Sequence, residues 1–410
     1  MNQKIVNYVE LIIKKGINIQ KGQILVVRSP IEAADFTREV VKAAYKNGAS
    51  EVVVHWNDDI VTKYRYIYGD DKIFDEFPDW QRDSLEYYRK KGAAFFMVDV
   101  EDPALLKDVD KNRIKRARKV RGLALKEYYD NIIENSNQWC IASVPSIPWA
   151  KTIFPELSDK EAVEKLWELI LQIMRSDKDD PIAQWDKHLQ NLKNRMDYLN
   201  SKNFVKLKYK NSLGTDLEIG LPEGHRWLGG SEKSKTGVEF VANMPTEEIF
   251  TLPHREKVNG VVYSSKPLVF GGVVIDRFKV VFKDGKVVDF DAETGKETLE
   301  KVFTIDENSK YLGEVALVPY DSPVSNSGKV FYNTLYDENA SCHLAVGSAY
   351  PVCLAGAESL SEEELLKKGV NISTNHVDFM IGTKDLEVIG IQEDGTEISI
   401  IKNGNFAFTL

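Results

Sequence analysis

The first half of the sequence alternates short, continuous apolar runs with stretches of helical periodicity. The apolar runs lie at residues 23–27, 50–56, 93–100 and 139–145, and helical patterns follow them. Strands that are apolar throughout, rather than at every second residue, are typical of parallel sheets whose two faces are covered by helices. The pattern predicts a doubly wound, mostly parallel α/β domain at the N-terminus.

The hydrophobic period changes from helix to strand after residue 203. Residues 204–221 (FVKLKYKNSLGTDLEIGL) alternate apolar and polar side chains around a turn, which predicts a β-hairpin. The same pattern recurs at 278–292 and at 386–408. A chain of 410 residues usually forms two domains. We therefore expect an α/β domain over 1–202 and a β-rich α+β domain over 203–410 that carries the catalytic site.

Two segments of the second half present acidic and histidine side chains at short spacings. In ENASCHLAVGSAY, Glu338 and His343 precede Tyr350, and in NHVD an extended backbone would aim His376 and Asp378 at one face. Metal ligands are often presented in this way. A lone histidine is also commonly an ordinary hydrogen-bonded side chain, and Glu-Asn pairs commonly form turns. The spacing alone leaves a metal site and a structural role equally open.

Two upstream segments add carboxylates in apolar surroundings. NMPTEEIFTLP carries Glu247 and Glu248, and only one of these can face a given site because adjacent side chains of an extended segment point in opposite directions. Glu314 stands at the head of the apolar run VALVP. A carboxylate in a buried strand must be paired, protonated or bound to a cation. The alternative for Glu314 is a position at the strand end that faces water.

Four motifs, taken in order, resemble the thermophilic-type metalloaminopeptidases, the family of aminopeptidase T, aminopeptidase S and aminopeptidase II. The motifs are NMPTEEIFT, the GE of YLGEVALV, YDENASCHLAVGSAYP and NHVDFMIG, and the resemblance covers essentially the whole chain. It implies a two-metal centre with Tyr350 as a catalytic neighbour, and it favours Glu248 over Glu247. It also implies a homodimer whose enclosed cavity admits short peptides. The implied ligands are Glu248, Glu314, Glu338, His343, His376 and Asp378.

Such a ligand set predicts hydrolytic chemistry. Four carboxylates in a partly buried pocket need counter-ions, which two divalent cations would supply, and mixed carboxylate and imidazole ligands suit Zn, Co or Mn. We expect a metal-activated water to attack the scissile carbonyl, with Glu314 as general base and Tyr350 as hydrogen-bond donor to the oxyanion. The prediction is a dimetal aminopeptidase. A dimetal amidase or deacylase, and a non-catalytic cation-dependent binding protein, are the alternatives.

Composition and missing motifs argue against several other classes of protein. The formal charge of −9 argues against a nucleic-acid partner, and neither a GxGxxG nor a GxxxxGK[ST] motif follows the N-terminal strands. No run of about 18 apolar residues predicts a membrane span. Three cysteines do not make a disulfide framework, so a reducing compartment, the cytoplasm, is expected. The basic run at 111–121 predicts a helix with a solvated face.

Overall fold

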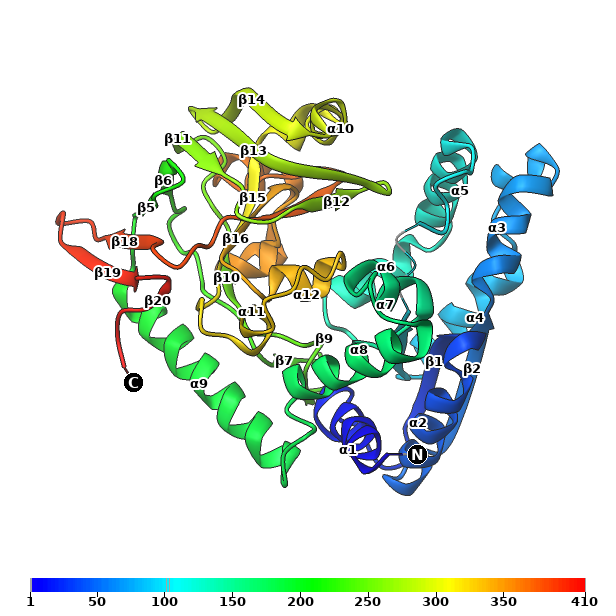
Figure 1. Ribbon diagram of the computed structural model, residues 1–410. Coiled ribbons are helices and arrows are strands. Elements are labelled where there is room, and N and C mark those ends of the chain that lie inside the picture. Colours follow the sequence, from blue (N-terminus) through cyan, green and yellow to red (C-terminus); the bar gives the residue numbers. More distant parts are fainter. Residues whose placement is uncertain (1, 101, 103, 410) are drawn as a thin grey trace. The chain divides into compact units, whose positions relative to one another are not determined.

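The computed structural model describes residues 2–100, 102 and 104–409 (Figure 1). The chain forms two compact units, Met1–Lys187 with Ser231–Pro245, and His188–Gly230 with Thr246–Leu410. Helix α9 (Pro181–Lys202) spans the change of unit, and a short segment returns to unit 1. The division into independently folding domains at residue 202 stays a prediction.

Unit 1 is built on a five-stranded sheet with the order β2-β1-β3-β4-β9, in which every neighbouring pair is parallel. The first four strands correspond to the predicted apolar runs. The fifth has only two residues, too few to show a hydrophobic period. The bounds are β1 Ile24–Pro30, β2 Glu51–Asn57, β3 Ala94–Asp99, β4 Trp139–Ser143 and β9 Asn243–Met244.

The helices of unit 1 differ in how deeply they are buried. Helix α2 buries Phe36, Val40 and Ala44 at helical spacing, whereas α3, α4 and α5 have no fully buried side chain. No helix in the described part of the chain is long and apolar enough to cross a membrane. The bounds are α1 Gln3–Leu11, α2 Ala34–Lys46, α3 Asp59–Tyr68, α4 Asp79–Lys90, α5 Lys111–Ala124, α6 Lys126–Ile133, α7 Ile147–Ile153 and α8 Asp159–Ile173; the short hairpin β7 Glu232–Lys233 and β8 Glu239–Phe240 completes the unit.

Unit 2 contains a nine-stranded antiparallel sheet with the order β12-β13-β11-β6-β5-β18-β19-β20, in which β14 pairs with β13. The three predicted hairpins are present as β5–β6, β13–β14 and β18–β19. The bounds are β5 Lys206–Lys210, β6 Asp216–Gly220, β11 Val258–Tyr263, β12 Leu268–Phe270, β13 Val273–Lys283, β14 Lys286–Thr294, β18 Glu387–Ile391, β19 Glu397–Lys402 and β20 Asn405–Phe406.

A second antiparallel sheet of unit 2 has four strands in the order β10-β15-β16-β17. Every residue of β15 and β16 is buried. Alternate residues on one face, among them Val315, Leu344 and Phe379, belong to the main hydrophobic core of the unit. The bounds are β10 Ile249–Thr251, β15 Leu312–Leu317, β16 His343–Gly347 and β17 His376–Met380, with helices α10 Lys296–Val302, α11 Pro323–Asn326, α12 Thr334–Glu338 and α13 Glu362–Lys367 in the same unit.

A parallel sheet with helices in one unit and antiparallel sheets in the other confirm the predicted fold class.

Candidate metal centre

Polar side chains occupy the face of the four-stranded sheet opposite the hydrophobic core. Glu314 of β15 pairs with Ala345 of β16, which pairs with Asp378 of β17. His343 lies two residues before Ala345, and His376 lies two residues before Asp378. Because successive side chains of a strand alternate between faces, all four polar side chains project from the same face. The hydrophobic alternation that builds the core therefore also gathers the site.

The histidines and carboxylates of this face are close together. His343 Nε2 lies 3.1 Å from Glu248 Oε2 and 3.4 Å from Glu314 Oε1. His376 Nε2 lies 3.2 Å from Asp378 Oδ1 and 3.6 Å from Glu314 Oε2. These residues form two groups of three, and in each group one ligand atom per residue lies within 4.8 Å of the others. Glu314 belongs to both groups.

Backbone carbonyls fix the orientation of both imidazole rings. His343 Nδ1 lies 3.1 Å from the Ser341 carbonyl oxygen, and His376 Nδ1 lies 2.8 Å from the Ser348 carbonyl oxygen. A carbonyl only accepts hydrogen bonds, so Nδ1 carries the proton and Nε2 faces the carboxylates. Histidines that bind metals are commonly oriented in this way.

The electrostatics of the cluster favour a bound cation. Burial raises the pKa of Glu314, and its removal from water disfavours the charged carboxylate. Burial alone would lower the pKa of His376, but Asp378 and then Glu314 raise it to about 10. The pKa of His343 is likewise held well above its usual value against burial, by Glu248 and Glu314. Positive charge is thus strongly stabilised at this site, and the donor atoms fit a divalent metal ion.

Glu338 and Tyr350 border the same cluster. Glu338 ends helix α12, and burial, Asp378 and Glu248 raise its pKa well above its ordinary value. The Tyr350 ring centroid lies 4.9 Å from that of His376, and burial and then Glu314 raise the pKa of its phenol well above 10. Tyr350 is 39% exposed, in contrast to Glu314 at 5%.

The two adjacent glutamates point to different neighbours. Glu248 approaches His343, whereas Glu247 Oε2 lies 3.6 Å from His188 Nε2 of helix α9. The Glu247 main-chain N–H donates to Asn339 Oδ1 at 2.6 Å. No pattern in the sequence marks His188 or Asn339 as part of this site. A Glu-Asn pair signals only a turn, and nothing local marks a histidine in a long helix.

The neighbouring thiol is not part of the ligand cluster. Cys342 precedes His343, and its Sγ donates to the Val318 carbonyl oxygen at 3.2 Å. Burial raises its pKa to about 11, so the thiol stays protonated at neutral pH. The donor set is therefore carboxylate and imidazole alone among the described residues, which suits Zn, Co or Mn.

Comparisons with known proteins identify the family. The model of the thermophilic metalloprotease (M29) family matches residues 1–406. Aminopeptidase 2 of Geobacillus stearothermophilus is 47% identical over 98% of this chain and 97% of its own length. Aminopeptidase AmpS of Bacillus subtilis (strain 168) is 46% identical over 99% of both chains, and Aminopeptidase T of Thermus thermophilus is 40% identical over 97% of both.

A comparison with solved structures supports the same family. Wild-type AmpT from Thermus thermophilus superposes with a TM-score of 0.93 at 38% identity, covering 99% of both chains. A 2,5-dihydroxypyridine dioxygenase from Pseudomonas putida KT2440 has a TM-score of 0.51 at 9% identity, which concerns the fold alone. The resemblance inferred from the four motifs is confirmed. The chain belongs to the thermophilic metalloprotease (M29) family and is a metal-dependent peptidase.

Proposed function

We propose that the protein is an aminopeptidase that releases N-terminal residues from short peptides at the cluster around Glu314. The carrying observation is that two groups of ligand atoms share this one carboxylate. The relatives reported above are all named aminopeptidases, which supports this activity over that of an amidase, a deacylase or a non-catalytic binding protein.

We propose that the cluster holds two divalent ions, Zn, Co or Mn. One would be held by Glu248, Glu314 and His343, and the other by Glu314, His376 and Asp378. Glu338, which lies in the field of the same carboxylates, would complete the ligand set. When bound, such ions polarise a carbonyl oxygen and lower the pKa of water.

The protein's own side chains would select and orient the substrate. The free α-amine of a peptide, in its neutral form, would be a further ligand at this centre, and an acetylated peptide lacks it. Glu314, which belongs to both ligand groups, is our candidate for the group that accepts the proton of the attacking water. Tyr350 keeps its proton at neutral and alkaline pH and would donate a hydrogen bond to the developing oxyanion.

Hydrolysis of a leucyl anilide and a leucyl dipeptide by chelator-stripped protein tests this proposal. Zn, Co and Mn are added back separately, and the N-acetylated substrates are the control. We expect activity to return with metal and to vanish when the substrate is acetylated. Equal cleavage of acetylated and free substrates would indicate an amidase instead.

We further propose a homodimer in the cytoplasm. On α3, Val61, Tyr64 and Tyr68 are more than half exposed and lie on one stripe, a surface that a second copy would cover. Light scattering of the purified protein measures its mass. All three cysteines are buried thiols, which agrees with a reducing compartment.

A further inference from the structure

Unit 1 contains a cavity of about 860 Å³ against one face of its parallel sheet. In register, Arg28 of β1 stands beside His55 of β2 and Met97 of β3, and Met97 stands beside Ile141 of β4. Side chains at paired positions of neighbouring strands project from the same face. All four residues line the cavity, so one row of side chains across the sheet forms its floor.

Helices pack directly against the amino-terminal half of this face. Val26 and Phe95, two residues before Arg28 and Met97, form a small core with side chains of α4 and α6 such as Leu85 and Tyr128. The cavity continues from this core toward the carboxyl ends of the strands, beneath residues of α3, α4, α5 and α6. Its volume falls in the range of small-molecule sites, about 300–1,000 Å³.

The cavity lies where the order of the strands reverses. The chain passes from β1 to β2 on one side and later places β3 on the other side of β1. In open α/β sheets, ligands bind at this switch point, outside the carboxyl ends of the strands. Arg28 lies near the carboxyl end of β1, at the switch point itself.

Three basic side chains of the cavity have polar atoms without a hydrogen-bond partner among the described residues. Arg28 is exposed to solvent and makes no hydrogen bond or ion pair with a described residue. Arg121 Nε and His55 Nε2 are buried without a hydrogen-bond partner. Of the described lining residues four are arginines, and Glu76 is the one carboxylate. Partial removal from water and the nearby charge of Arg121 lower the pKa of Arg28, whereas the charge of Asp59 raises it. An anion between these two arginines would satisfy both.

Aromatic rings form much of the remaining wall. Trp56, Tyr66, Trp80 and Tyr128 come from β2, α3, α4 and α6. Large rings beside cationic side chains suit a ligand with a flat apolar body and an anionic group. Because no glycine-rich phosphate loop follows β1, a dinucleotide is not the expected ligand.

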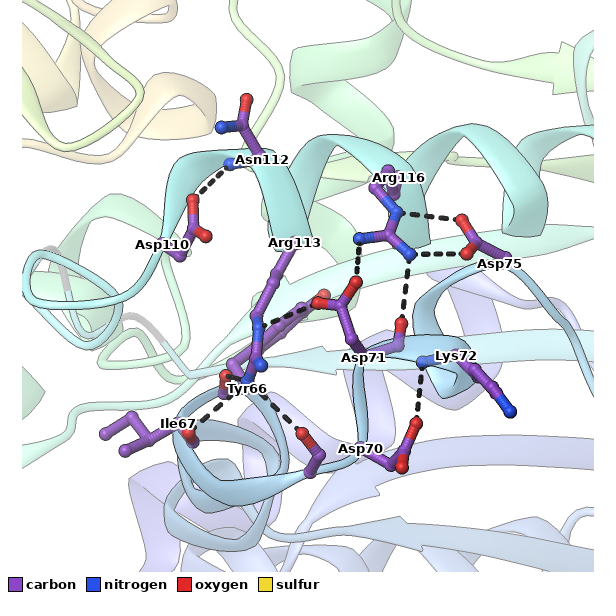
Figure 2. A network of polar contacts seen from close by, with 11 residues as sticks. Tyr66, Ile67, Asp70, Asp71, Lys72, Asp75, Asp110, Asn112, Arg113 and Arg116 are labelled. Atoms are coloured by element: carbon purple, nitrogen blue, oxygen red, sulfur yellow. Dashed lines mark hydrogen bonds and ion pairs between the residues drawn. The ribbon is translucent and has the colours of Figure 1, made fainter.

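The helices above the cavity are tied to each other by polar contacts (Figure 2). Arg113 of α5 donates to the Tyr66 carbonyl oxygen at 2.8 Å, near the end of α3. Arg116 pairs with Asp71 at 2.6 Å and also with Asp75, on the turn after α3. The basic run of α5, expected to be a solvated face, thus has two roles. Arg113 and Arg116 bind the segment at the end of α3, while Arg118 and Arg121 line the cavity.

We propose that this cavity, whose described lining residues all belong to unit 1, binds a small organic anion with an aromatic body, held by Arg28 and Arg121. The anionic group, a carboxylate or a phosphate, would lie against the guanidinium groups, and the apolar body would lie among the rings. Peptides and amino acids, the substrates and products of a peptidase, carry such a carboxylate.

Isothermal titration calorimetry of the metal-loaded, full-length protein tests this proposal with three probes. N-acetyltryptophan carries a carboxylate, AMP carries a phosphate, and N-acetyltryptophanamide keeps the indole without charge. Acetylation also removes the α-amine that the peptidase centre would bind. We expect at least one anion to bind at least tenfold more tightly than the neutral amide, and the tighter anion identifies the charged group.

Variants locate the binding site. We expect Arg28→Gln and Arg121→Gln each to weaken binding of the preferred anion at least tenfold. Arg38→Gln, on the surface of α2 and paired with Asp35, is the matched control and should leave binding unchanged. Leucyl-anilide hydrolysis and thermal unfolding show that the variants are folded. Equal binding of acid and amide in the unaltered protein, no binding of either anion, or unchanged binding in a folded Arg28→Gln variant would each overturn the proposal.

Discussion

The adjacent glutamates Glu247 and Glu248 give a matched pair of variants at the residue scale. Glu248→Gln removes a carboxylate that faces His343, whereas Glu247→Gln alters one that faces His188. We expect Glu248→Gln to lower metal affinity by more than about 100-fold, and Glu247→Gln by about tenfold or less, because it acts through its neighbours. Metal content after dialysis against a graded chelator measures both. Equal losses would show that the two side chains share the site.

Tyr350 has a role that can be separated from metal binding. Its ring centroid lies 4.9 Å from that of His376, whereas the candidate ligands are carboxylates and imidazoles. Tyr350→Phe keeps the ring and removes the hydroxyl, so we expect kcat to fall by about 10²–10³-fold while the metal content stays constant. Steady-state kinetics with a leucyl anilide, alongside elemental analysis, decides this. An unchanged kcat would make Tyr350 a packing residue.

At the scale of elements, the site depends on an irregularity in β15. The register between β15 and β16 shifts between Leu312 and Glu314, and a Cβ at Gly313 would lie 2.3 Å from the Ser348 carbonyl oxygen. That carbonyl also accepts from His376. The glycine therefore lets the strand approach closely enough to place Glu314 and His376 together.

Gly313→Ala should accordingly destabilise the protein by about 2–3 kcal/mol, because backbone atoms must move. Gly122→Ala in helix α5 is the control, because beyond the adjacent residues and the backbone of its own helix a Cβ there would meet no atom of the described residues within 4 Å. An alanine in a helix interior should stabilise by about 0.5–1 kcal/mol. Urea unfolding measures both free energies. A neutral Gly313→Ala would mean that the strand tolerates a wider spacing.

Local sequence signals predict some elements of this fold and not others. Continuous apolar runs identified β1 to β4, and alternation with turn glycines identified the hairpins, because both signals are local. The pairing of β15, β16 and β17 joins residues tens of positions apart, and no local signal determines it. The ligand set was therefore obtained from a resemblance rather than from spacing. His188 and the cavity of unit 1 bring together residues that are distant in the sequence, so only the three-dimensional structure reveals them.

At the scale of the whole molecule, metal binding should be linked to pH. In the metal-free protein His376 holds its proton up to a pKa of about 10, and His343 is raised in the same direction. A metal ligand must be the neutral imidazole, so binding near pH 7 should release protons and affinity should rise toward pH 10. Calorimetry in two buffers of different ionisation enthalpy counts the protons. Binding without proton release would contradict the assignment of these histidines.

The same linkage predicts how stability changes with pH. A histidine whose folded pKa is raised stabilises the fold fully below its unfolded pKa of about 6.5, and this contribution is lost as pH rises through the folded value. The metal-free protein should therefore lose stability between about pH 6.5 and 10. The metal-loaded protein should not, because its histidines carry no proton in this range. Thermal unfolding of both forms across this range makes the comparison.

A metal titration of chelator-stripped protein tests the shared role of Glu314 most directly. Bound ions are counted by mass spectrometry while hydrolysis of a leucyl anilide is followed, in the unaltered protein and in Glu314→Gln. We predict that activity saturates at two ions per chain, and that Glu314→Gln loses both ions over the same range together with more than about 100-fold of the activity. Full activity without bound metal, or a Glu314→Gln variant that binds two ions and retains activity, would contradict a centre built on this carboxylate.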